Sequence, residues 1–130
     1  MRASNRSGKG ADPAMRKWVL LAFFLFFLPA AAAQSPPQVM GYGVKGCRDY
    51  ADAYAGREAG DEVGIAEYRR YQDWLTGIVT GLSLATATDV LKGVEVNSAL
   101  RRIEIYCDEH PDEDFFNAAM DLVRTLSVLE

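Results

Sequence analysis

The sequence predicts a small all-α domain of four helices that is held together by one disulfide. Apolar residues recur at helical spacing in several segments, and no segment alternates apolar and polar residues for long enough to indicate a strand. The chain contains two cysteines, Cys47 and Cys107, and both follow a predicted export signal. Exported chains enter an oxidising compartment, where a lone cysteine pair usually forms a disulfide.

Residues 1–33 are predicted to be a signal peptide. Arg16 and Lys17 form a short positive region, residues 18–28 form an apolar run, and Ala31–Ala33 fit the small-residue pattern that precedes a cleavage site. The run is shorter than the roughly 20 residues that span a bilayer, so we expect cleavage rather than an uncleaved anchor. These features predict a periplasmic or secreted location.

The start of translation has two interpretations. The residues before Met15 are rich in glycine, serine and arginine and show no structural pattern, whereas Met15 begins an ordinary signal peptide. The true start is therefore either Met1 or Met15.

The charge of the chain limits the classes of partner. Of 14 basic and 18 acidic residues, five and one lie in residues 1–33, so the remaining 97 residues carry nine basic and 17 acidic side chains and a formal charge of −8. This argues against nucleic acid and anionic lipid as partners, and we expect no membrane association after cleavage. A basic protein partner is compatible with this charge. The alternative is that the acidic surface only maintains solubility.

The predicted elements begin after a flexible lead-in over residues 34–45, which is rich in proline and glycine. The helical domain is expected over residues 46–130. The first helix has Cys47, Tyr50, Ala51 and Tyr54 on one face and ends near Gly56 and the Gly60–Asp61 pair.

The second helix is predicted from about Val63 to Ala85. Its apolar stripe alternates spacings of three and four residues and consists of Tyr68, Tyr71, Leu75, Ile78 and Leu82, widened by Trp74. Residues 86–96 are expected to form a loop.

A third and a fourth helix follow the loop. Asn97 or Ser98 is predicted to cap the third helix, whose inner face is Leu100, Ile103 and Cys107 and which Pro111 ends. Asp112 is predicted to cap the fourth. The apolar stripe of the fourth helix comprises Phe115, Phe116, Ala119, Leu122, Val123 and Leu126.

Both cysteines lie on apolar helical faces, so a bond between them would join the first helix to the end of the third. The bond would close a segment of about 60 residues, to which the loop-entropy model assigns roughly 4 kcal/mol. The alternative is a pair of free buried thiols.

The sequence predicts no catalytic residue, no metal site and no cofactor. The single histidine, His110, has acidic neighbours and fits a solvated helix junction. The acidic stretch 108–114 lacks the alternation and glycine of an EF-hand loop, and helix capping explains most of it. Ser83 misses the last glycine of the nucleophile-elbow pattern. We therefore expect a protein that is not an enzyme.

Two glycines in the second helix, Gly77 and Gly81, are four residues apart. Each costs roughly 1 kcal/mol of helix propensity against alanine, which is tolerable where another backbone packs closely. That backbone is either a neighbouring helix of the same domain or a partner in a self-association or client-binding groove. In the second case the candidate partner-binding residues are Tyr68, Tyr71, Trp74, Gly77, Ile78 and Gly81.

The order of these features resembles the HdeA/HdeB family over roughly residues 46–126. The resemblance rests on segments 46–50, 74–77, 89–96 and 105–107, followed by Pro111 and Phe115. It implies a small periplasmic four-helix protein with one disulfide. The activity that it implies is acid-stress chaperoning by a non-enzymatic, ATP-independent holdase, a dimer that opens on acidification and holds unfolding proteins.

The residues offer a physical route to such acid activation. Below about pH 4 the carboxylates lose much of their charge, and the net charge moves from −8 toward roughly +9 or +10. The resulting repulsion between helix surfaces would loosen the domain.

One part of the chain departs from this family. The region after the first cysteine helix is longer and more charged, and the stretch 74–81 is similar to small periplasmic immunity proteins that neutralise type VI secretion effectors. Those proteins are also helical and disulfide-bonded. The alternative function is therefore a periplasmic immunity or binding protein that neutralises one secreted effector.

Overall fold

A computed structural model describes residues 13–15 and 35–129. The chain divides into two compact units, Met1–Pro36 and Pro37–Glu130. The predicted signal peptide, residues 1–33, lies almost wholly outside the described residues, and the account below concerns the second unit.

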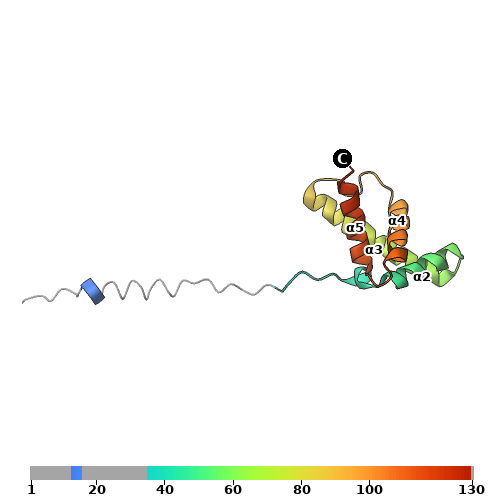
Figure 1. The fold of residues 1–130 in the computed structure, drawn as a ribbon, viewed down its shortest axis with the longest axis horizontal. Helices are drawn as coiled ribbons and strands as arrows, with labels where there is room; N and C mark the ends of the chain where they lie inside the picture. Colours follow the sequence, from blue (N-terminus) through green and yellow to red (C-terminus); the bar gives the residue numbers. More distant parts are fainter. Residues whose placement is uncertain (1–12, 16–34, 130) are drawn as a thin grey trace, which may run out of the picture. The chain divides into compact units, whose positions relative to one another are not determined.

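The described part of the second unit is helical, which confirms the predicted all-α class. A short 3-10 helix, η1 (Gly41–Val44), precedes four α-helices (Figure 1). They are α2 (Cys47–Glu58), α3 (Glu62–Thr86), α4 (Val96–Glu109) and α5 (Phe115–Ser127). The long second predicted helix agrees with α3 to within one residue at each end.

Helices α2 and α3 form a hairpin whose backbones come very close. A Cβ atom built on Gly64 would lie 2.5 Å from the backbone of Gly56, so only glycine fits at this crossing. Asp61 begins α3 by accepting a hydrogen bond from the Gly64 amide at 2.8 Å. Gly56 therefore lies inside α2 and makes a helix contact, whereas the sequence suggested a break there.

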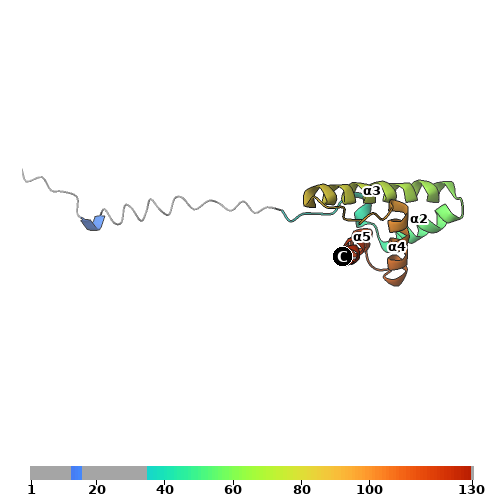
Figure 2. The same ribbon diagram turned by 90° about the horizontal axis from the view of Figure 1, so that it is seen from above.

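Helices α4 and α5 lie on the same side of α3 and cross it steeply, as the two views together show (Figures 1 and 2). Rings from α2, α3 and α5 form an aromatic core. The ring centroids of Tyr50, Tyr71 and Phe115 lie 4.8–5.0 Å from one another. The last turns of α3 extend past α5, and Leu84 there is 79% exposed.

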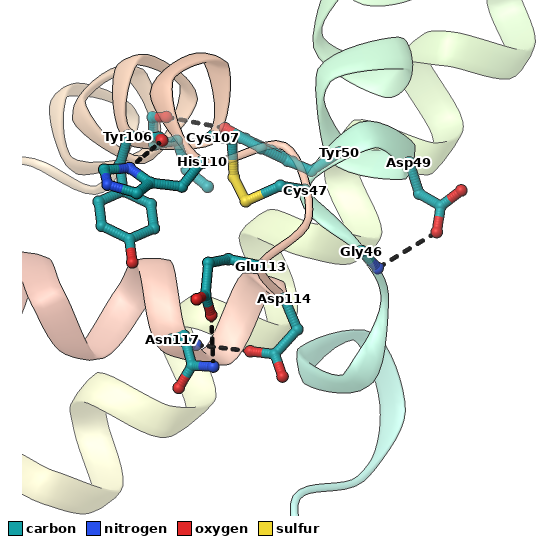
Figure 3. The surroundings of a disulfide bond; sticks show 11 residues. Gly46, Cys47, Asp49, Tyr50, Tyr106, Cys107, His110, Glu113, Asp114 and Asn117 are labelled. Carbon is teal, nitrogen blue, oxygen red and sulfur yellow. Dashed lines mark hydrogen bonds between the residues drawn. A yellow bond between two sulfur atoms is a disulfide. The ribbon is translucent and has the colours of Figure 1, made fainter.

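The disulfide joins the start of α2 to α4. The Cα atoms of Cys47 and Cys107 are 4.9 Å apart, and both side chains are buried (Figure 3). The Cys47 amide also donates to the Glu113 carbonyl at 2.8 Å. The predicted pairing, first helix to end of the third, is therefore confirmed.

Two predicted helix caps are wrong by two or three residues. Glu95, not Asn97 or Ser98, is the N-cap of α4. Asp114, not Asp112, caps α5 by accepting from the Asn117 amide at 2.7 Å. The reason for the second shift lies far away in the chain, because the Phe115 amide donates to the Lys45 carbonyl and fixes where α5 begins.

The predicted lead-in over residues 34–45 is also corrected. Residues 37–45, which we call the N-terminal strap, belong to the domain, and η1 lies within them. Gly43 is buried, and an isolated bridge joins Gly46 to Asp114. Proline and glycine content suggested flexibility here, but contacts with α3 and α5 order this segment.

Candidate functional site

The candidate site is a groove of about 740 Å³ between the N-terminal strap, α3 and α5, which we call the Trp74 groove. Its strap wall is residues 37–40, and its helical wall is Asp73, Trp74, Gly77 and Ile78 of α3. Phe116 of α5 completes it. Apart from Gln38 and Asp73, the lining side chains are apolar.

The indole of Trp74 contacts both the N-terminal strap and α5. Its Nε1 donates a hydrogen bond to the Met40 carbonyl at 2.9 Å, and its ring packs edge-to-face on Phe116 at 6.5 Å between centroids. The backbone of Gly43 lies so close to the ring that a Cβ atom there would clash with it. Gly41 adopts a positive φ of 67° as the strap turns around the indole.

Polar contacts fix the strap to α3. The Tyr42 hydroxyl donates to the Glu67 carboxylate at 3.0 Å, and Arg70 donates to the same hydroxyl at 3.1 Å. The Tyr42 ring packs edge-to-face on Tyr71 at 4.8 Å. The groove is therefore built in the folded domain and does not depend on a partner to hold its walls.

The structure brings together three of the six predicted partner-binding residues. Trp74, Gly77 and Ile78 line the groove. Gly81 is exposed on α3 but does not line it. Tyr68 and Tyr71 are only 4% and 1% exposed, so as anchors for a partner of the folded domain they are corrected to core residues.

The close helix contact suggested for Gly77 and Gly81 is not found within the described residues. A Cβ atom at either position would meet no heavy atom within 4 Å. A close contact between helix backbones that requires glycine is found instead at a different pair, Gly56 and Gly64, where α2 and α3 touch. Gly77 and Gly81 instead lie on an exposed face of α3 that no other described element covers at these positions.

The residues considered for chemistry have structural roles. His110 is exposed, stacks on Tyr106 at 4.3 Å between centroids, and places Nδ1 3.0 Å from the Tyr106 carbonyl oxygen (Figure 3). The Ser83 hydroxyl accepts from the Val90 amide at 3.2 Å and so orders the loop after α3. Within residues 13–15 and 35–129, no group of three or more potential ligands could hold a metal ion.

Burial shifts the pKa of two kinds of group. It raises the pKa of the core tyrosines Tyr50, Tyr68 and Tyr71, because a buried phenolate is poorly solvated. Partial burial also raises the pKa of Glu104, and the neighbouring Asp108 carboxyl adds to this shift through its charge and a hydrogen bond. Glu104 therefore binds a proton more readily in the folded domain than in the unfolded chain.

Sequence reasoning missed the strap wall and assigned Phe116 only to an apolar stripe. One signal was available in the sequence: glycines at 41 and 43 permit close approach to an aromatic side chain as readily as they indicate flexibility. Nothing in the local sequence showed that Trp74, 34 residues away from Met40, would be that side chain.

Comparisons of the chain with protein-family models, with curated proteins and with solved structures found no match. Among the described residues, no helix is both long enough and apolar enough to cross a membrane.

Proposed function

We propose that this chain is a non-enzymatic protein-binding domain that holds an apolar segment of a partner protein in the Trp74 groove. The observation that carries this proposal is a concave, mostly apolar site lined by Trp74 and Phe116 together with the polar Asp73. Ligand sites commonly combine an apolar lining with a few polar groups. Buried aromatic anchors dominate binding energy at protein interfaces.

The compartment that fits this proposal is periplasmic or extracellular. A buried disulfide between Cys47 and Cys107 is typical of oxidising compartments, and the predicted signal peptide agrees with export. The formal charge of −8 for residues 34–130 favours partners with a basic surface.

Two classes of partner are compatible with this domain. The first is one specific protein that occupies the groove, such as a secreted effector that this chain neutralises. The strap and α3 hold the groove open in the native state, which supports binding of a folded domain to a defined partner. Glu104 adds to this argument. Its raised pKa means that protonation on acidification stabilises the folded state, so this group opposes opening of the domain by acid.

The second class is the set of unfolding proteins that an acid-stress holdase would capture, as the resemblance to the HdeA/HdeB family implies. The feature that supports it is the aromatic core of Tyr50, Tyr71 and Phe115. If the helices separated, these rings would become accessible, and the disulfide would still tether α2 to α4.

A matched pair of glycine substitutions tests the groove. Gly77 and Gly81 both lie on α3 with open space around them, but only Gly77 lines the groove. The protein, immobilised at pH 7, is used to recover partners from the periplasm of its host. We expect Gly77→Gln to weaken capture of the recovered partner at least tenfold and Gly81→Gln to leave it within twofold. Equal capture by both variants would remove the groove from the mechanism.

An aggregation assay separates the two classes of partner. A native-state binder recovers one predominant protein at pH 7 and leaves aggregation of an unrelated model protein unchanged at pH 3. A holdase suppresses aggregation of the model protein at pH 3 and recovers a diffuse set at pH 7. If the protein neither recovered a partner at pH 7 nor suppressed aggregation at pH 3, the protein-binding proposal would fail.

A further inference from the structure

We propose that a second pocket, between α2 and the first half of α3, binds an organic cation, namely a primary ammonium or a guanidinium group. The pocket has a volume of about 280 Å³ and shares no lining residue with the Trp74 groove. Its lining includes four carboxylates, those of Asp49, Asp52, Asp61 and Glu67. This inference does not depend on the proposed function.

The pocket carries an excess of negative charge. The lining residues carry four carboxylates and one ammonium, that of Lys45, which is a formal charge of −3. One of these carboxylates, that of Glu67, is also paired with Arg70 from outside the pocket, at 3.0 Å. Asp49 and Asp61 accept backbone hydrogen bonds at helix starts, from the amides of Gly46 and Gly64. Asp52 makes no hydrogen bond or ion pair within the described part of the chain, so its carboxylate is available to a ligand.

The hydroxyl of Tyr71 supplies the second, independent observation. Tyr71 lines the pocket but is only 1% exposed, and its hydroxyl has no hydrogen-bond partner among the described residues. Natural proteins rarely leave a buried hydroxyl unpaired, because its desolvation is then uncompensated. An N–H group of a bound cation would donate to this oxygen.

The charges of the pocket act on the Tyr71 hydroxyl. After burial, the largest causes of its raised pKa are the charges of Asp49 and Glu67, with Asp52 further down the order, and all three line the pocket. The hydroxyl of Tyr50, another core tyrosine, donates to the Leu100 carbonyl at 2.8 Å and is satisfied within the domain.

The ammonium group of Lys45, a residue that lines the pocket, already contacts a carboxylate and an aromatic ring there. It lies 3.9 Å from the Glu67 carboxylate and 4.8 Å from the centre of the Tyr42 ring. Because the Tyr71 hydroxyl is covered in this structure, some lining side chains must move when a cation reaches it. Lys45 has a long, partly exposed side chain that is able to do so, whereas Glu67 is held by hydrogen bonds from Tyr42 and Arg70.

The geometry favours an organic cation over a metal ion. The described residues contain no group of three ligands close enough together for one metal, whereas carboxylates spread around 280 Å³ suit a larger cation with several N–H donors. The ammonium or guanidinium group could belong to either of two ligands: a free polyamine, or an arginine or lysine side chain of a partner protein.

An NMR titration of the whole protein tests the proposal and separates these sources. One arm uses spermidine, a second uses a glycine-flanked peptide with a single arginine, and magnesium chloride at equal ionic strength controls for screening. We expect saturable shifts at the amides of Gly56 and Gly64, which line the pocket. Tighter binding of spermidine identifies a free cation, and tighter binding of the peptide identifies a partner side chain.

Three variants assign the effect to the pocket. We expect Asp52→Asn to weaken binding about tenfold and Tyr71→Phe about fivefold, as losses of hydrogen bonds to a charged ligand commonly do. Glu109→Gln, which removes an exposed carboxylate outside the pocket, should change the affinity less than twofold. Shifts that do not saturate, an equal response to magnesium, or an equal loss in Glu109→Gln would overturn the proposal.

Discussion

At the scale of single residues, the two most deeply buried tyrosines differ in how their hydroxyls are satisfied. Tyr50 donates to the Leu100 carbonyl, whereas the Tyr71 hydroxyl has no partner among the described residues. Their rings pack against each other and against Phe115, so phenylalanine at either position keeps the aromatic contacts. The pair therefore isolates the contribution of a hydrogen bond within one core.

We predict opposite effects of Tyr50→Phe and Tyr71→Phe on the free energy of unfolding. Tyr50→Phe removes a buried hydrogen bond and should lower it by about 1 kcal/mol, whereas Tyr71→Phe removes an unpaired hydroxyl and should raise it by up to about 1 kcal/mol. Urea denaturation of the three proteins measures both values. A loss of stability in Tyr71→Phe would show that its hydroxyl is already satisfied in solution.

At the scale of elements, glycine has two opposite meanings in this domain. Gly64 allows the backbones of α2 and α3 to touch, whereas Gly81 lies inside α3 with open space around it. Only the first position has a packing reason to lack a Cβ atom. The cost that Gly81 imposes on α3 is therefore not offset by any contact within the described domain.

Alanine substitutions should separate these two roles. Gly64→Ala places a Cβ atom 2.5 Å from the Gly56 backbone, and we expect it to lower the free energy of unfolding by about 2 kcal/mol or more. Gly81→Ala should raise it by up to about 1 kcal/mol through helix propensity. Thermal unfolding followed by circular dichroism measures both. A stable Gly64→Ala variant would mean that the two helices can separate at little cost.

At the scale of the whole molecule, the disulfide is the main covalent constraint on a small core. It closes a loop with a sequence separation of 60 residues and joins α2 to α4. Reduction by a thiol reagent, or the double substitution Cys47→Ala with Cys107→Ala, should lower the free energy of unfolding by about 4 kcal/mol. Urea midpoints of the oxidised and reduced protein measure the difference. An unchanged midpoint would show that helix packing alone holds the domain.

The core tyrosines should also make the domain unstable at high pH. Because burial raises the pKa of Tyr50 and Tyr71 in the folded state, their contribution is fully present below the pKa of an unfolded tyrosine, about 10, and is lost as the pH rises above it. We therefore expect the urea midpoint to fall steeply between about pH 10 and pH 12. Absorbance of tyrosinate, recorded alongside, should rise together with unfolding. Ionisation without unfolding would contradict this prediction.

Part of the candidate site could be read from the sequence. Trp74, Gly77 and Ile78 have helical spacing and share one face of α3, so their proximity follows from the helix alone. The same pattern could not show that Tyr71 faces the core while Trp74 lies at its edge. That distinction depends on where Phe115 and the strap pack against α3.

The sequence alone predicted the helical class and the limits of α3, because apolar periodicity and helix-start chemistry act between residues a few positions apart. It also predicted the cysteine pairing, because the chain has only one pair of cysteines. Tertiary packing alone decided the Trp74 groove, the start of α5 and the acidic pocket. Each of these joins residues that are distant in the chain, as Met40 and Trp74 are, and no local pattern records which surfaces meet when the helices fold together.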